Sequence, residues 1–208
     1  RRGLATDNLR WAIERCAARK LIAGLDATPA GREVYRPLGF VDGWGLHRLR
    51  AESPKLAEPR LDLVLRPMRA DDLAEISAMD AAAFGAARTS LLAHLFERLP
   101  PCAWVARDQT GGLAGFLLGR DGRLTWHLGP LMARDTEVAT ALLARGLTGL
   151  PAAGAEAVTI DVADGQPGFS SRLVDAGFTP LRPFTRMLSR QIAALPASTY
   201  AIAGPELG

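Results

Sequence analysis

Cysteine, lysine and long apolar runs are all scarce in this chain of 208 residues. Its two cysteines, Cys16 and Cys102, stand far apart and lack the paired spacing of a thiolate zinc site. We therefore expect no metal site and no disulfide framework, and such sparse cysteine favours a reducing cytoplasm. No uninterrupted apolar run reaches membrane-spanning length, so we predict no membrane partner.

Clusters of basic residues are also missing, although the formal net charge is +3 and the isoelectric point is about 9.3. The basic side chains are almost all arginine, are scattered along the chain, and are matched by 22 acidic residues. Without a Lys/Arg run or an alternation of basic and aromatic residues, we predict no nucleic-acid partner. A hydrophobic fraction of 48% with 23% charged residues is that of a globular protein with a packed core.

What the chain does contain begins at its first residue. The stretch Arg1–Thr6 (RRGLAT) leads into a predicted helix, whose apolar stripe runs through Leu9, Ile13 and Cys16. A helix N-terminus presents unpaired N–H groups and the positive end of its dipole, which suits an anion such as a pyrophosphate. A glycine-containing helix start without any ligand explains the same residues. Since the chain lacks an initiator Met and starts within this motif, we expect its true N-terminus to lie further upstream.

The residues after this helix extend the pattern. An apolar strand is predicted over residues 21–26, and a short helix then ends in Tyr35-Arg36-Pro37-Leu38-Gly39-Phe40. With Gly3 and Ala5 at the small positions of the opening loop, this order resembles the C-terminal half of a GNAT-superfamily N-acetyltransferase. In that family a Gln/Arg-x-x-Gly-x-Gly/Ala loop opens a helix, and a later helix ends in Tyr-x-x-Leu-Gly-Phe. The resemblance implies an α/β (α+β) fold, a mixed central sheet flanked by helices.

A second pattern follows residues 51–60, a polar stretch with two prolines that we interpret as a linker. Over residues 61–190 the predicted order is strand, two helices, three strands, helix, strand, helix and strand, as in a complete GNAT domain. Its later part aligns with residues 1–50, because Asp26 precedes Leu38-Gly39-Phe40 as Asp161 precedes Ala176-Gly177-Phe178. We therefore predict a tandem GNAT protein whose first copy, residues 1–50, lacks its N-terminal half and whose second copy is degenerate. One unrelated α+β domain is the alternative.

Residues 191–208 form a tail in which Tyr200–Pro205 is apolar and β-prone. Because a free tail is expected to be polar, we expect this one to cover the first domain or the cleft between domains. The predicted strand at residues 21–26 also needs a partner, since an apolar edge invites aggregation. We expect that partner to be the missing preceding strands, the tail or another protomer, so that a homodimer would meet the need.

The resemblance also implies which residues of the first copy act on acetyl-CoA. The loop residues would hold its pyrophosphate: Arg2, Gly3, Leu4, Ala5 and Thr6. Thr28 falls where many family members carry a CoA-contacting Asn. Tyr35 stands at the position of the acid that protonates the departing thiolate. A core aromatic whose hydroxyl meets the surface is the alternative interpretation of Tyr35.

The corresponding positions of the second copy are altered. Glu137 replaces the glycine of the phosphate loop and Leu173 replaces the acid, so we expect weak or no CoA binding there. His127 lies on the predicted fourth strand, where a histidine can act as the base for an amine. A packed or surface histidine is the alternative.

Side chains that face an acceptor are predicted in both copies. Asp80, Phe84 and Arg88 end the first helix of the second copy, a region that faces substrate in many GNAT enzymes. Trp44 and His47 lie on the strands that close the first copy. Helix surface and core packing explain Asp80, Phe84 and Arg88 equally well, and core packing is the default interpretation of Trp44 and His47.

Together these observations predict a cytoplasmic, acetyl-CoA-dependent N-acetyltransferase. We expect the acceptor to be a small-molecule amine, with a protein N-terminus or lysine as the other class. Two alternatives stay open. One is a non-catalytic GNAT-like scaffold or ligand-sensing module, and the other is catalysis in the second copy with His127 as base.

Overall fold

The computed structural model describes residues 3–123, 125–150, 154, 156–191 and 194–207. The helices are α1 (Leu4–Ala18), α2 (Pro29–Tyr35), α3 (Leu73–Phe84), α4 (Thr89–Arg98), α5 (Thr136–Gly149) and α6 (Pro167–Asp175). Short 3-10 turns of the described residues lie at Arg36–Leu38, Ala70–Asp72 and Pro100–Cys102. The strands are β1 (Gly24–Ala27), β2 (Val41–Ala51), β3 (Val64–Pro67), β4 (Trp104–Arg107), β5 (Leu113–Arg120), β6 (Trp126–Ala133), β7 (Val158–Ala163), β8 (Thr179–Leu188) and β9 (Thr199–Ala201).

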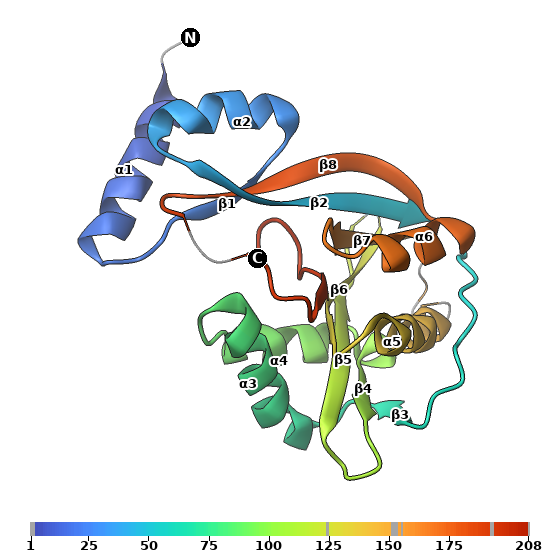
Figure 1. Cartoon of the computed structure of the whole chain (residues 1–208). Helices are drawn as coiled ribbons and strands as arrows, with labels where there is room; N and C mark the ends of the chain where they lie inside the picture. The colour runs from blue at the N-terminus through green and yellow to red at the C-terminus, as the bar shows by residue number, and fades with distance from the viewer. Residues whose placement is uncertain (1–2, 124, 151–153, 155, 192–193, 208) are drawn as a thin grey trace.

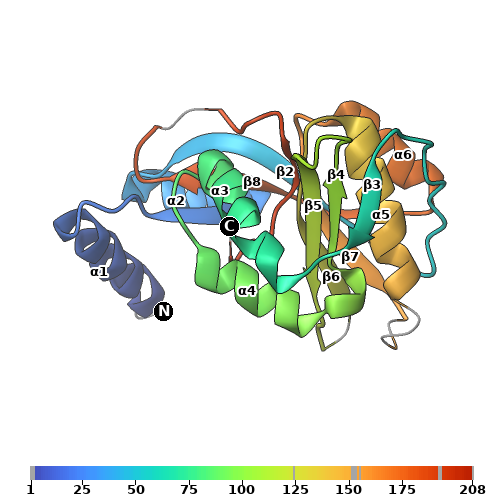
Figure 2. The ribbon, with the colours of Figure 1, turned by 90° about the horizontal axis from the view of Figure 1, so that it is seen from below.

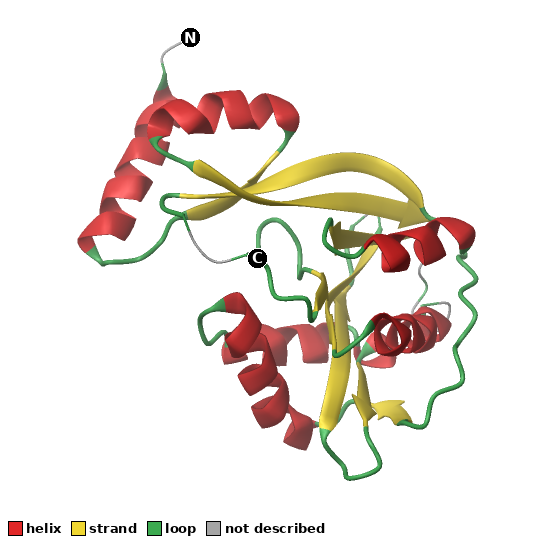
Figure 3. Cartoon of the chain, in the orientation of Figure 1, coloured by secondary structure: helices red, strands yellow, loops and turns green. Residues whose placement is uncertain are grey.

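One mixed sheet of nine strands runs through the described part of the chain, in the order β1-β8-β2-β7-β9-β6-β5-β4-β3. Strands β6 and β7 are parallel where Trp126–Leu128 faces Val158–Ile160. The other described pairings are antiparallel. Helices α3 and α4 lie on one face of the β4–β6 part, and α5 and α6 lie on the opposite side (Figures 1 and 3). This is the α/β arrangement of a mixed sheet flanked by helices.

The strands of the N-terminal segment (residues 3–50) alternate in the sheet with those of the C-terminal segment (residues 61–190). Strand β8 lies between β1 and β2, and β2 lies between β8 and β7. Our expectation that β1 pairs with preceding strands, the tail or another protomer is therefore wrong for its inner edge, because β8 supplies a four-residue antiparallel ladder from Gly24↔Leu188 to Ala27↔Thr185. The domain boundaries at 51–60 and 190 stay a prediction.

The order helix, strand, helix, strand occurs twice along the chain, as α1-β1-α2-β2 and as α5-β7-α6-β8. In both series the second helix is followed by a glycine in the left-handed region, Gly39 at φ 90° and Gly177 at φ 96°. Glycine suits this position because it lacks the Cβ that makes positive φ costly. A buried phenylalanine follows each glycine, Phe40 and Phe178.

Helices α1 and α5, which open the two series, differ sharply in burial. Helix α5 buries most of its length in the main core, including Val138 and Leu142, as expected for a helix that is apolar on several sides. No residue of α1 is buried in the described structure, and Leu4 and Trp11 are 66% and 64% exposed. Helix α1 lies at the end of the molecule, beyond β1 (Figures 1 and 2).

Two buried ion pairs join the N-terminal and C-terminal segments. Asp26 on β1 accepts two hydrogen bonds from Arg186 on β8, at 2.5 and 2.8 Å. Asp161 on β7 accepts two from Arg48 on β2, both at 2.7 Å. Both aspartate side chains are fully buried. Each pair crosses from one segment to the other, so the sheet is held together at this junction by charge as well as by backbone hydrogen bonds.

Candidate active site

The N-terminus of α1 is open and carries no side-chain cap from the described residues. Its first residue is preceded by Gly3 at φ 66°, ψ 1°, a left-handed conformation that favours glycine. A Cβ built on Gly3 would meet nothing closer than Asp7 Oδ2 at 4.0 Å, so a side chain at this position has room among the described residues, with the Asp7 carboxylate nearby. The first amides of a helix, here those of Leu4 and Ala5, have no acceptor within the helix. Such a start fits a phosphate group.

Of the loop residues predicted to bind the cosubstrate, Gly3, Leu4, Ala5 and Thr6 therefore lie together at this helix start. The amide of Thr6 is already used, since it donates to the Gly3 carbonyl at 2.9 Å. Arg2 lies outside the described residues. The predicted phosphate site thus consists, as far as it is described, of backbone amides.

The N-terminus of α5 is closed by its own side chains. Asp135 caps the helix, accepting from the backbone N–H of Val138 at 2.9 Å. Glu137 forms an ion pair with Arg172 of α6, and the Arg172 hydrogen bond lowers the pKa of this carboxyl. Two carboxylates therefore stand where the sequence alignment places the phosphate loop of the second copy.

Tyr35 is the last residue of α2 and is half-buried. The edge of its ring meets Phe40, with the ring centroids 6.1 Å apart. At the aligned position of α6 stands Leu173, fully buried in the main core. Thr28 caps α2, because its hydroxyl accepts from the backbone N–H of Gly31 at 3.2 Å. This capping bond explains Thr28 without a ligand.

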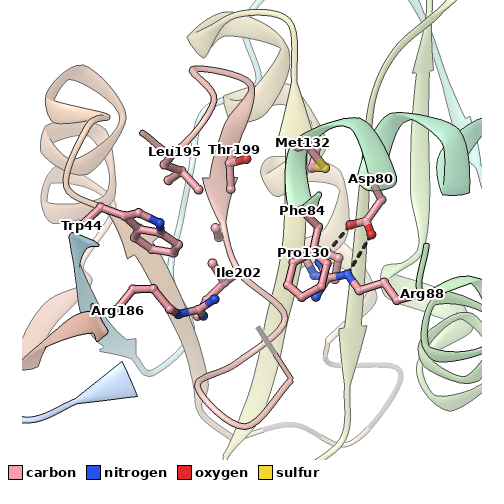
Figure 4. A pocket seen from close by; sticks show the side chains of 12 residues that line it. Trp44, Asp80, Phe84, Arg88, Pro130, Met132, Arg186, Leu195, Thr199 and Ile202 are labelled. Carbon is pink, nitrogen blue, oxygen red and sulfur yellow. Dashed lines mark hydrogen bonds and ion pairs between the residues drawn. The ribbon is translucent and has the colours of Figure 1, made fainter. Parts of the chain in front are cut away.

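A pocket between β2 and β8 on one side and α3 on the other collects residues from four distant parts of the chain (Figure 4). Its lining consists of Trp44, Asp80, Ala83, Phe84, Arg88, Pro130, Met132, Arg186, Leu195, Thr199, Ala201 and Ile202. Four of the five side chains predicted to face an acceptor are among them. The fifth, His47, is exposed and hydrogen-bonded to Asp164 at 2.7 Å.

Two arginines give the pocket its polar character. Arg88 forms a bidentate pair with buried Asp80, at 2.7 and 2.9 Å, and its guanidinium lies 4.1 Å from the ring centroid of Phe84. On the opposite wall, Arg186 lies 4.9 Å from the ring centroid of Trp44 (Figure 4). Aromatic faces attract cations, so each arene holds its arginine in place. The pocket is thus walled by aromatic and aliphatic groups, with guanidinium groups whose charges are already paired with buried carboxylates.

His127 lies on β6 and is almost fully buried. Its Nε2 lies 3.3 Å from the Ile202 carbonyl oxygen, which can only accept, and its Nδ1 lies 3.2 Å from the Thr159 hydroxyl. Asp161 Oδ2 is 3.8 Å from Nε2. Burial lowers the pKa of His127, so the ring is neutral near pH 7. Both ring nitrogens have intramolecular neighbours, and the tail contacts one of them.

Within the described ranges, no helix has the length and apolar character needed to span a membrane. The same ranges contain no group of three or more His, Cys, Asp or Glu side chains placed to hold a metal ion.

The sequence profile of the acetyltransferase (GNAT) domain matches residues 76–200, so the chain belongs to the GNAT family of acetyltransferases. An uncharacterized N-acetyltransferase, YitH, of Bacillus subtilis is 29% identical over 154 residues, which are 74% of this chain and 53% of that protein. The chain thus spans about half the length of this curated relative.

Solved structures show the same fold. A putative acetyltransferase from Pyrococcus horikoshii superimposes with a TM-score of 0.74 at 22% identity, covering 100% of this chain and 67% of that one. A GCN5-related N-acetyltransferase from Sphaerobacter thermophilus gives a TM-score of 0.66 at 15% identity, over 93% of this chain and 70% of the other.

Sequence reasoning missed several side chains of the site, chiefly Arg186, Met132 and Ile202. One signal could have pointed to Arg186. Asp26 and Asp161 each stand in an apolar strand, and a buried carboxylate requires a cation or several donors nearby. Two such aspartates predict two arginine partners, although not which of the many arginines these are.

Proposed function

We propose that this chain is part of an acetyl-CoA-dependent N-acetyltransferase in which the N-terminal segment binds the cosubstrate. Membership of the GNAT family supports the reaction class. The acceptor we propose is an amine of a small molecule, bound in the pocket between Trp44 and Phe84. That pocket is bounded by residues of both segments, as expected if the C-terminal segment shapes the acceptor site.

The main support for this assignment is the difference between the N-termini of α1 and α5. At α1 the N-cap is a glycine, no side chain of the described residues caps the helix, and the first amides face outward. At α5 the amide of Val138 is taken by Asp135, and Glu137 adds a second carboxylate. A pyrophosphate can bind the outward-facing amides at α1, where Asp7 is the one acidic residue of the first turn. At α5 it would have to displace Asp135 and disrupt the pair between Glu137 and Arg172. We therefore assign cosubstrate binding to α1, with Gly3–Thr6 as the cradle and Arg2 as an added charge.

The bound thioester would supply the acetyl group to be transferred. The acceptor amine attacks its carbonyl carbon, so one C–N bond forms and one C–S bond breaks. The nitrogen loses a proton and the departing thiolate gains one. Tyr35 is the proposed donor of that proton, because it ends α2 at the position of the family's acid and its aligned counterpart, Leu173, has no proton to give.

The repeated order of elements supports the proposal that the chain contains parts of two GNAT copies. In each series the second strand pairs with both strands of the other series, since β2 lies beside β7 and β8, and β8 lies beside β1 and β2. Leu46 faces Phe184 near the middle of the β2–β8 ladder. The pair between Arg48 and Asp161 joins β2 to β7, and the pair between Arg186 and Asp26 joins β8 to β1. In this interpretation each copy contributes its second strand, β2 or β8, to the sheet of the other copy.

Titration calorimetry with acetyl-CoA on the full-length protein tests the assignment. Gly3→Glu should weaken binding at least tenfold, because a carboxylate then replaces open space at the helix start. Gly3→Asn is the matched control, since asparagine tolerates positive φ and carries no charge. Glu137→Gly should change affinity little. The assignment fails if Glu137→Gly alters binding while Gly3→Glu leaves it intact.

A further inference from the structure

Residues 196–207 of the tail are built into the sheet at the point where β6 and β7 diverge. These two strands pair directly at Trp126–Leu128 and Val158–Ile160, and beyond that point β9 lies between them. Ala201 faces Leu131 on β6 and Val162 on β7. The amide of Ile202 donates to the Asp161 carbonyl at 3.1 Å. The tail therefore completes the backbone hydrogen bonding of both diverging strands.

Side-chain contacts fix the tail in the same gap. The Tyr200 hydroxyl lies 3.2 Å from the Thr136 hydroxyl in the first turn of α5. The Tyr200 ring packs edge-on against Phe169 of α6, with the centroids 5.2 Å apart. Gln166, just before α6, donates to the Ala197 carbonyl at 2.6 Å. One strand thus touches the starts of both helices that flank the gap.

Strand β6, which lies beside the tail, has a glycine where the tail backbone approaches closely. Gly129 on β6 has φ 149°, and a Cβ at this position would lie 2.1 Å from the Ile202 carbonyl oxygen. No side chain fits there while the tail is in place. The same carbonyl accepts from His127 Nε2 at 3.3 Å, and Tyr200, Ala201, Ile202 and Ala203 are all at most 3% exposed.

The position of the tail between β6 and β7 determines whether a cosubstrate can bind to the C-terminal segment. The parallel strands β6 and β7 lead into α5 and α6, respectively. A cosubstrate held by its phosphates at the start of α5, with its thiol at the aligned acid position on α6, would therefore run between the ends of these two strands. We propose that the tail permanently occupies this thioester channel of the C-terminal segment. The channel is therefore closed to acyl-CoA, and Thr199, Ala201 and Ile202 serve instead as one wall of the acceptor pocket. The second part of this inference rests on the proposed function.

Hydrogen exchange tests the closure without any activity measurement. The reporter amides are those of Ile202, which donates to Asp161, and Ala133, which donates to the Ser198 carbonyl at 2.9 Å. In Gly129→Ala the new methyl group must displace the tail, so both amides should exchange at least tenfold faster. Gly111→Ala is the matched control, because Gly111 also has positive φ but a Cβ there meets nothing within 4 Å.

A second variant distinguishes displacement of the tail from misfolding of β6. Ile202→Pro removes the donor to Asp161 from the tail side and leaves β6 and β7 intact, so Ala133 should again lose protection. Unchanged exchange at Ala133 in both Gly129→Ala and Ile202→Pro overturns the proposal.

Stoichiometry of CoA binding tests the channel itself. In the full chain, Glu137→Gly alone should still bind one equivalent of CoA, because the tail remains in place. Adding Gly129→Ala should raise this to two equivalents. Two equivalents in Glu137→Gly alone, or one in the double variant, contradicts the closure. If Gly3→Glu has no effect on the first equivalent, the proposed function fails while the exchange data still decide where the tail lies.

Discussion

The ion pair between Arg48 and Asp161 should contribute strongly to the stability of the sheet. The Asp161 side chain is fully buried, the Arg48 side chain is 18% exposed, and two hydrogen bonds of 2.7 Å join them. Arg48→Met keeps the aliphatic stem and removes the charge. The carboxylate is then left buried between β2 and β7 without its cation, which costs about 3–5 kcal/mol of unfolding free energy.

Removing both charges of this pair should restore the stability that is lost in Arg48→Met. Arg48→Met combined with Asp161→Leu replaces both charges by apolar groups, and such replacements are neutral or stabilising by about 1–4 kcal/mol in other proteins. The double variant should therefore be far more stable than Arg48→Met alone. Arg50→Met is the control, because Arg50 pairs with exposed Glu52 and such surface pairs contribute about 0–1 kcal/mol.

Urea unfolding followed by far-UV circular dichroism gives the free energies, and thermal unfolding gives an independent check. For a chain of this size about 1 kcal/mol corresponds to roughly 2–4 °C, so Arg48→Met should lower Tm by roughly 6–20 °C. Because Arg48 and Asp161 belong to different segments, the loss should appear in one cooperative transition. A loss as small as that of Arg50→Met, or a double variant no better than the single, would refute the reasoning.

Three further outcomes follow from single side chains. Tyr35→Phe should lower kcat by roughly ten- to a thousandfold while calorimetry finds acetyl-CoA affinity near normal, and unchanged turnover would make Tyr35 structural. Burial depresses the pKa of His127, so as the pH falls below about 6.5 the unfolded chain takes up a proton before the folded chain does. The contribution of neutral His127 to the free energy of unfolding is therefore present above about pH 6.5 and is lost as the pH falls. The decline in Tm between pH 7.5 and 5 should flatten in His127→Gln but not in the exposed control His94→Gln. Burial raises the pKa of the Cys102 thiol to about 12, so iodoacetamide should label Cys16 and spare Cys102 in the native protein, as mass spectrometry can establish.

Local pattern was enough to predict much of the secondary structure. The order expected over residues 61–190, strand, two helices, three strands, helix, strand, helix and strand, is the order observed from β3 to β8, and the glycine before Phe40 ends the 3-10 turn Arg36–Leu38 in the left-handed region. The tail was expected to pack because it is apolar, and its residues 200–203 are buried. These features depend on neighbours within a few residues, which is why the sequence by itself determined them. The family resemblance, too, came from two short motifs.

Strand partners and the site were decided by the tertiary structure. Nothing in the residues of β1 predicts that β8, about 160 positions away, lies beside it, since any apolar strand offers the same backbone donors and acceptors. The pocket likewise joins Trp44, Asp80, Arg186 and Ile202, whose contact depends on how the two segments alternate in the sheet. The open start of α1 could be predicted from Gly3, because helix capping is local. The closure beside α5 could not, because the strand that fills the gap, β9, follows the C-terminal segment in the chain and is held in the gap by tertiary packing.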